Sequence, residues 1–373
     1  MFYFDYCATT PTNKEVLNFF EEVNNKYWFN PNSNYEPSVA GAKLIMDSAN
    51  KILNILGLKD STVIFTSGAT EANNLALKGY CYANKEKGKH IITSPYEHSS
   101  IVATLSALEK EGFEVTIADT NEAGEVDVDK LKTLIRDDTI LVSITATSSE
   151  VGIINDIESI ANLLTNYDNC KFHVDYTQLF GKYKNDLSNV DMLSYSGHKI
   201  YGIKGVGALI IKNDINLSPI INGGKSTTKY RAGTPSTELI ASLGKASELI
   251  YENFEAKEAD IKTKSDYLKE KLLGLSDSIK INTPENGLAS IINVSILGHK
   301  SEEIQQTLAK KDIYVSTQTA CSLKLDYSPT IYKLTNDLKR AESSIRVSIS
   351  YLTTIEEIDY LIKAIGELLW LSY

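Results

Sequence analysis

Cysteines are few in this sequence, and positive charge is not in excess. The four cysteines stand far apart without the CxxC spacing of zinc ligands, so we expect neither a disulfide framework nor a metal site. The formal net charge of -10 argues against non-specific binding to nucleic acid or anionic lipid, because both ligands need a basic protein face. A small-molecule substrate fits this composition better.

Long apolar runs are also missing. No stretch reaches the roughly 20 apolar residues of a membrane span, and the opening MFYFDYCATTPTNKE has neither the basic nor the apolar region of a secretory signal. We therefore expect a cytoplasmic protein that works without a membrane. With 373 residues, of which 42% are hydrophobic, the chain is long enough for two globular domains.

From about residue 62 onward, short β-rich runs alternate with longer amphipathic segments. This pattern is typical of βαβ units around a mostly parallel sheet, so the predicted fold class is α/β. Helices are expected at residues 71–85, 99–112 and 156–167. Strands are expected at residues 62–67, 89–95, 114–120, 139–145, 171–177, 192–197 and 208–212. Sheets of this kind place ligands beyond the C-terminal ends of their strands.

Residues 236–273 have the composition of long helical material that leads the chain out of the sheet. Strands near residues 289–296 and 344–349 follow, with a closing helix from about residue 355. We predict a large domain over residues 14–245. A smaller α+β domain would cover residues 246–373 and include residues 1–13.

A lysine lies just after one expected strand, and an aspartate lies at the end of another apolar run. Lys199 stands in SYSGHKIYG; alone it would be read as a surface residue, but Ser196 and His198 add phosphate-type donors beside it. A partly desolvated lysine among such donors has the lowered pKa that Schiff-base chemistry needs. Asp175 ends the apolar strand KFHVD, where a buried carboxylate needs a positive partner such as a pyridinium nitrogen. The alternative for Asp175 is an ordinary helix cap.

Three further positions favour a ring ligand that carries a phosphate. Gln178 is placed to bond a ring hydroxyl. In FTSGATEANN, Ala69 and Thr70 open a helix whose free backbone N–H groups bind phosphate, although the same motif also serves plain capping. His98 in SPYEHSS follows a strand, where an imidazole can stack on a ring and relay protons; a hydrogen-bonded surface histidine is the alternative.

The motifs SGATE, EHSS, SSEVG, HVDYTQ, SGHK, YRAGT, TACS and SSIR follow one another along the chain. In this order they resemble the class V, fold-type I pyridoxal-phosphate (PLP) enzymes, specifically the cysteine desulfurases of the NifS and IscS type. The resemblance runs from FDYCATTPT nearly to the C-terminus. It implies a PLP-dependent transferase fold with a seven-stranded sheet, a homodimer with a shared active site, and conversion of L-cysteine to L-alanine.

The resemblance also implies a role for each residue at the cofactor. Lys199 would form the Schiff base and move the substrate's α-proton, Asp175 would pair with the pyridinium, and His98 would stack on the ring. Further contacts to the cofactor would come from Ala69, Thr70, Ser149, Gln178, Ser196, His198 and the partner subunit's Thr234.

For the substrate, the resemblance points to three more residues. Arg346 in SSIR would clamp the substrate carboxylate with its planar fork. Asn30 is a second candidate, with a simple turn before Pro31 as an equal alternative. Cys321, in the polar stretch STQTACSLKLDYSPT, would take the sulfur as a persulfide. It would pass the sulfur to an acceptor protein, such as an iron–sulfur scaffold or a tRNA-thiolation enzyme.

The other cysteines and several departures from the family pattern temper this assignment. Cys81 and Cys170 suit buried, inert thiols, while Cys7 lies in the N-terminal motif without an assigned chemistry. Ser149 stands where the family has an amide, Tyr176 replaces a small residue, and Lys225 replaces a glycine. Two alternatives therefore stay open: another class V PLP reaction, such as a cysteine or cystine C–S lyase or an aminotransferase, and a non-catalytic PLP-binding partner protein.

Overall fold

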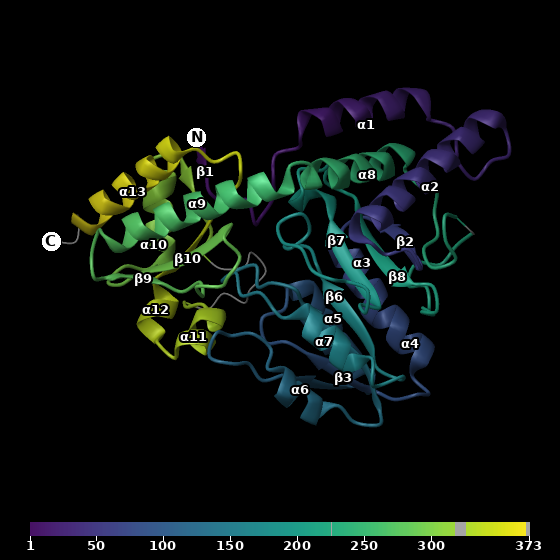
Figure 1. Ribbon diagram of the computed structural model, residues 1–373, viewed down its shortest axis with the longest axis horizontal. Helices are drawn as coiled ribbons and strands as arrows, with labels where there is room; N and C mark the ends of the chain where they lie inside the picture. Colours follow the sequence, from purple (N-terminus) through teal and green to yellow (C-terminus); the bar gives the residue numbers. More distant parts are fainter. Residues whose placement is uncertain (225, 318–325, 371–373) are drawn as a thin grey trace.

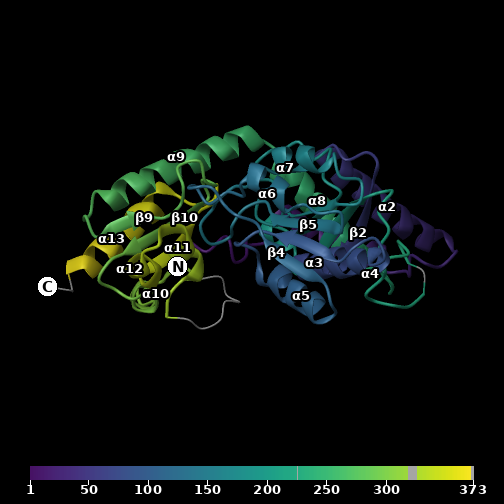
Figure 2. The ribbon, with the colours of Figure 1, turned by 90° about the horizontal axis from the view of Figure 1, so that it is seen from below.

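The computed structural model describes residues 1–224, 226–317 and 326–370. They form two lobes, a larger one around a seven-stranded sheet and a smaller one around a three-stranded sheet (Figure 1). The two lobes lie side by side, and helix α9 (Phe254–Leu273) carries the chain from the larger to the smaller lobe (Figure 2). Among the described helices, none is both long enough and apolar enough to cross a membrane.

The sheet of the larger lobe has the strand order β2-β8-β7-β6-β5-β3-β4. Only β8 runs antiparallel to its neighbours in this sheet, so the sheet is mostly parallel. Its strands are β2 (Ser61–Thr66), β3 (His90–Thr93), β4 (Glu114–Ile117), β5 (Thr139–Thr145), β6 (Lys171–Asp175), β7 (Met192–Ser196) and β8 (Gly207–Lys212). All seven strands expected from the sequence are present, which confirms the α/β fold class.

Both faces of this sheet are buried, and the strand sequences explain why. Val63 and Phe65 of β2 join one apolar cluster, whereas Ile64 between them joins a second cluster. In β5, Leu141 and the adjacent Val142 divide between the clusters in the same way. Alternate residues of a strand point to opposite faces, so nearly continuous apolar strands require helices on both sides. Because both faces are covered, polar side chains that bind a ligand are expected at the ends of the strands.

Two of the helices that cover this sheet, α6 (Val128–Leu134) and α7 (Ile157–Leu164), begin at an aspartate cap. Asp127 and Asp156 accept backbone N–H groups at the starts of α6 and α7, as their short polar side chains favour. The expected helix at 71–85 is present as α3, a π-helical turn and α4. The helices of this lobe are α1 (Lys14–Lys26), α2 (Glu36–Leu56), α3 (Ala69–Asn74), α4 (Tyr80–Asn84), α5 (Ser99–Lys110), α6 (Val128–Leu134), α7 (Ile157–Leu164) and α8 (Thr237–Tyr251).

The smaller lobe contains the antiparallel strands β9 (Ile279–Ile281), β10 (Ile291–Ile296) and β12 (Ser344–Ser348). The expected strands near 289–296 and 344–349 and the closing helix α13 (Ile355–Trp370) are confirmed. The N-terminal strand β1 (Phe2–Tyr3) pairs with β11 (Ile313–Tyr314) in this lobe. Strands of two or three residues have no detectable periodicity, so β1, β9 and β11 were not predicted. The lobe also contains α10 (Ser301–Ala309), α11 (Pro329–Thr335) and α12 (Leu338–Glu342).

The helical stretch predicted over residues 236–273 is divided into α8 and α9. Glu252 has an extended backbone, and Asn253 takes a left-handed conformation with φ of 53°. Asparagine adopts this region more readily than most residues, so the chain turns here without a glycine. The predicted boundary after residue 245 lies within α8, and the division into two domains stays a prediction.

Candidate active site

Lys199 ends a single 3-10 turn that follows strand β7. Its Nζ donates hydrogen bonds to the backbone carbonyls of Cys7 and Ala8, the latter at 2.9 Å. Burial lowers the pKa of Lys199 to about 8, and the positive charges of Lys182 and Arg346 act in the same direction. About a tenth of this amine is therefore neutral at pH 7, far more than for an ordinary lysine, and the neutral form is the one that a nucleophilic lysine requires.

Asp175 is the last residue of β6 and is buried. Its Oδ2 accepts a hydrogen bond from Nδ2 of Asn73 at 2.8 Å, and its Oδ1 accepts one from the backbone N–H of Thr177 at 3.0 Å. Within the part of the chain that the structure describes, this carboxylate forms no ion pair. A buried negative charge held by hydrogen bonds alone favours a positively charged group on a ligand.

His98, directly before α5, is affected by the charges of both residues. Its Nδ1 accepts the backbone N–H of Ser100 at 3.2 Å and also bonds the hydroxyl of that serine at 2.8 Å. Burial lowers the pKa of His98, while the charge of Asp175 raises it and that of Lys199 lowers it further. Both charges act on one imidazole, so the structure brings Lys199, Asp175 and His98 to the same edge of the sheet.

The candidates for phosphate binding gather where β2 and β7 end. Gly68 caps the N-terminus of α3, and a Cβ placed on it would lie 3.5 Å from Oγ of Ser196. A Cβ on Gly207, at the start of β8, would lie 2.7 Å from Cα of Gly68, so only glycine fits there. The first residues of α3, Ala69 and Thr70, therefore lie beside Ser196, and their free backbone N–H groups suit an anion.

Of two further phosphate candidates, His198 lies in the 3-10 turn that ends at Lys199, and Thr234 lies on a loop. The Nδ1 of His198 bonds the hydroxyl of Thr9 at 3.2 Å, and burial lowers the pKa of His198 to about 4. The imidazole is then neutral and offers one N–H. Thr234 is exposed, and its loop is tied to α3 by an ion pair of 3.0 Å between Arg231 and Glu71.

Arg346 reaches this region from β12 in the smaller lobe. Its Nη2 donates to Oδ1 of Asp5 at 2.6 Å, and its Nη1 donates to the backbone carbonyl of Ser149 at 2.8 Å. Its buried Nε has no partner among the described residues. Burial acts to lower the pKa of Arg346, but the charges of Cys7 and Asp5 hold it above its usual value. Asn30 is exposed and accepts a backbone N–H two residues on, which is the turn role weighed as its alternative.

The structure adds residues that the sequence did not assign to the site. Nε2 of Gln178 donates to the carbonyl of Cys7 at 2.9 Å, and Oε1 of Gln178 accepts from Nζ of Lys182 at 3.3 Å. The position of Cys7 in the N-terminal motif was a signal for its proximity. No motif or spacing pointed to Lys182.

The proposed sulfur acceptor, Cys321, lies outside the described residues. Cys81 and Cys170 are both buried, as expected for inert thiols. Burial raises the pKa of each, for Cys170 to about 12, so neither is a thiolate near neutral pH. Cys7 is buried as well.

Tyr176 departs from the family pattern without filling the site. Its side chain is fully buried, and its hydroxyl donates to the backbone carbonyl of Tyr183 at 3.1 Å. The ring packs edge-on against Phe180, with ring centroids 6.4 Å apart. The extra volume at position 176 is therefore accommodated in the core beneath the sheet edge.

Known proteins that are similar to this chain identify its family. Residues 2–361 match the family model described as aminotransferase class-V, so the chain belongs to that family, which depends on PLP. The curated cysteine desulfurase IscS of Clostridium botulinum is 37% identical over 98% of this chain and 94% of its own length. The mitochondrial cysteine desulfurase of Saccharomyces cerevisiae is 35% identical over 98% of this chain and 74% of its own.

Solved structures agree with these relatives. A NifS-like protein superposes with a TM-score of 0.92 at 29% identity, covering 100% of both chains. A structure described as SspA in complex with cysteine has a TM-score of 0.82 at 30% identity and covers 95% of this chain and 100% of its own. The chain therefore belongs to the NifS and IscS family of cysteine desulfurases.

The residues present fit PLP. A buried carboxylate without a counter-ion suits the pyridinium nitrogen, and the amine of Lys199 suits the aldehyde carbon. Thr177 donates its backbone N–H to Asp175, while its own hydroxyl is buried without a partner among the described residues. That hydroxyl is therefore available to a bound ligand. The N-terminus of α3, which follows Gly68 and lies beside Ser196, suits the phosphate.

Proposed function

We propose that this protein is a cysteine desulfurase that converts L-cysteine to L-alanine and carries the sulfur on Cys321 to an acceptor protein. The observation that carries this proposal is that Lys199, whose pKa is lowered to about 8, and the buried carboxylate of Asp175 lie at or just after the ends of neighbouring parallel strands, and the charges of both act on His98. Membership of the family, and relatives that carry the name cysteine desulfurase over nearly the whole chain, support the substrate.

PLP would be held by a covalent bond to Lys199, an ion pair with Asp175 and stacking of His98. Gln178 and Ser149 would lie at its ring hydroxyl. When bound, the cofactor supplies an electron sink for negative charge at the substrate's α-carbon. Its phosphate would be bound by the backbone N–H groups at Ala69 and Thr70, by Ser196 and His198, and by the partner subunit's Thr234.

The chain's own residues then divide the remaining work. Arg346 would bind the substrate carboxylate, and its Nε is the part of the guanidinium still without a partner among the described residues. Lys199, neutral in part near pH 7, would take the α-proton. The thiolate of Cys321 would attack the substrate sulfur, forming an S–S bond as the Cβ–S bond breaks. The electron pair of the broken bond stays with the substrate carbon, which takes up a proton to leave as alanine.

The decisive experiment compares wild type with three variants, each incubated with L-cysteine and PLP. Wild type should produce alanine above the rate of free PLP and carry a persulfide at Cys321, detected by mass spectrometry. Lys199→Ala should lose alanine production, and Cys321→Ala should lose persulfide formation. Cys170→Ala, which removes a buried thiol, serves as the matched control and should keep both.

The same assay separates the alternatives. A C–S lyase would release sulfide and keep its turnover in Cys321→Ala, and an aminotransferase would need an oxo-acid partner. A non-catalytic PLP-binding homologue would show an absorption band that depends on Lys199 but no alanine above the free-PLP rate. Any one of these three results would remove the desulfurase proposal.

We also propose a homodimer with a shared active site. Apolar side chains are exposed along α1, α2 and the segment between them, including Trp28 at 71% exposure and Met46 at 58%. An exposed apolar face of this kind is typical of a subunit interface. Light scattering tests the dimer, and activity recovered on mixing inactive Lys199→Ala with Thr234→Ala subunits tests the shared site. We further propose a cytoplasmic location, with an iron–sulfur scaffold or a tRNA-thiolation enzyme as sulfur acceptor.

A further inference from the structure

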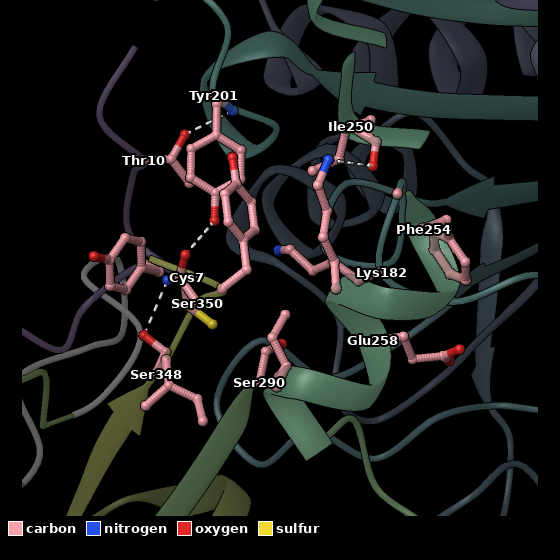
Figure 3. Close-up of a pocket in the computed structure, with 16 residues that line it drawn as sticks. Cys7, Thr10, Lys182, Tyr201, Ile250, Phe254, Glu258, Ser290, Ser348 and Ser350 are labelled. Atoms are coloured by element: carbon pink, nitrogen blue, oxygen red, sulfur yellow. Dashed lines mark hydrogen bonds between the residues drawn. The ribbon is translucent and has the colours of Figure 1, made fainter. Parts of the chain in front are cut away.

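A second lysine, half-buried like Lys199, lies close to it. Lys182 follows Gly181 in the segment after β6, and it lines a cavity between the two lobes with Cys7 and Ser290. Figure 3 shows the Lys182 amine and the Cys7 side chain directed toward the same space. Burial lowers the pKa of Lys182, and among the described residues it forms no ion pair.

The hydrogen bonds of Lys182 fix the orientation of a neighbouring amide. An ammonium group can only donate, so the Gln178 atom that it contacts at 3.3 Å must be Oε1. The other end of that amide, Nε2, is then directed to the carbonyl of Cys7 at 2.9 Å. The same carbonyl accepts a hydrogen bond from Nζ of Lys199. Lys182 is thus connected to Lys199 through one side chain and one backbone carbonyl.

Lys182 also acts on Lys199 through its charge. The positive charge of Lys182 lowers the pKa of Lys199, as does that of Arg346, whereas Cys7 and Asp5 raise it. On the other sides of Lys199 lie two histidines, whose pKa values its charge lowers in turn: His98 on α5 and the adjacent His198. Like charges in a poorly solvated site favour the neutral form of one member, and here that form is the one that Lys199 needs.

We propose that Lys182 is a positioning residue for Lys199: it orients the Gln178 amide toward the Cys7 carbonyl, and its positive charge favours the neutral amine of Lys199. The importance of this role for turnover rests on the proposed function, but the role itself concerns only the chain. Its charge effect and its hydrogen-bonding effect are separable by substitution. Methionine removes both, glutamine removes the charge and keeps a donor, and arginine keeps the charge.

The test measures the pKa of Lys199 in the cofactor-free protein. Wild type and variants are labelled with an amine-reactive reagent over a range of pH, and the extent of labelling at Lys199 is quantified by mass spectrometry. We expect the pKa of Lys199 to rise by about half a unit to one unit in Lys182→Met and Lys182→Gln, because removing a like charge from a partly shielded site stabilises the ammonium form. Lys182→Arg should keep the wild-type value.

Lys257→Met is the matched control, because Lys257 lines the same cavity but is not among the charges that act most strongly on Lys199. Melting curves show which variants are folded, and if Lys182→Met does not fold, Lys182→Gln decides the test. A pKa of Lys199 that stays unchanged or falls in the folded neutral variants would overturn the proposal, as would an equal rise in Lys182→Arg. A rise in a protein that makes no alanine would uphold this inference while removing the desulfurase function.

Discussion

Glu97, next to His98, provides a sharp test of the electrostatics of this site. Its Oε1 accepts hydrogen bonds from the hydroxyl of Ser94 at 2.5 Å and from the backbone N–H of Thr145 at 2.7 Å. Its Oε2 is buried without a partner among the described residues. Burial raises the pKa of Glu97 to about 8 from a reference value of 4.5, and the charge of Asp175 acts in the same direction. The carboxyl group is therefore protonated at neutral pH.

This shift makes stability depend on pH in a defined direction. The folded state binds the Glu97 proton more tightly than the unfolded state, so between pH 4.5 and about 8 stability falls as pH rises. Each pH unit within this window costs about 1.36 kcal/mol, and from pH 5 to pH 7 the cost is about 2.7 kcal/mol. Glu97→Gln keeps the accepting oxygen and removes the titration. Relative to wild type, its free energy of unfolding should therefore rise by about 2.7 kcal/mol between pH 5 and pH 7.

The assay is urea unfolding, followed by circular dichroism at pH 5 and pH 7, with the free-energy difference between variant and wild type as the measured quantity. Glu22→Gln, at an exposed position on α1, is the control and should show no such change with pH. If the difference between Glu97→Gln and wild type is the same at both pH values, the reasoning about burial at this position is refuted.

Two further predictions concern packing and charge around the same site. In Gly207→Ala the new Cβ would meet the carbonyl of Tyr195 at 2.6 Å, so we expect a loss of roughly 1–3 kcal/mol in urea unfolding; a variant as stable as wild type would contradict the close packing. The same change should also raise the dissociation constant of PLP at least about tenfold in a fluorescence titration. Displacing the start of α3, where the phosphate would bind, needs to cost only about 1.4 kcal/mol of binding free energy to produce this factor. Asp5→Ala removes the ion-pair partner of the buried Arg346 and should cost about 3–5 kcal/mol in urea unfolding, whereas a loss below about 1 kcal/mol would show that solvent screens this pair.

The sequence by itself determined the strands of the larger sheet and the residues that end them. Apolar runs with turn residues between them predicted all seven strands, because a strand buried on both faces has little choice of residue type. Asp175 and Lys199 were found because a polar residue directly after such a run falls at the sheet edge where ligands bind. These signals are local, so a single sequence contains them.

The tertiary structure alone decided which distant residues surround Lys199. Residues 5 and 346 form an ion pair, and residues 7 and 199 a hydrogen bond, because β1 joins the smaller lobe before the chain enters the larger one. No spacing in the sequence encodes these contacts, and none indicates that Lys182 lies half-buried beside Gln178. The pKa of Lys199 depends on the combined burial and charge of segments nearly 350 residues apart, and only packing brings those segments together.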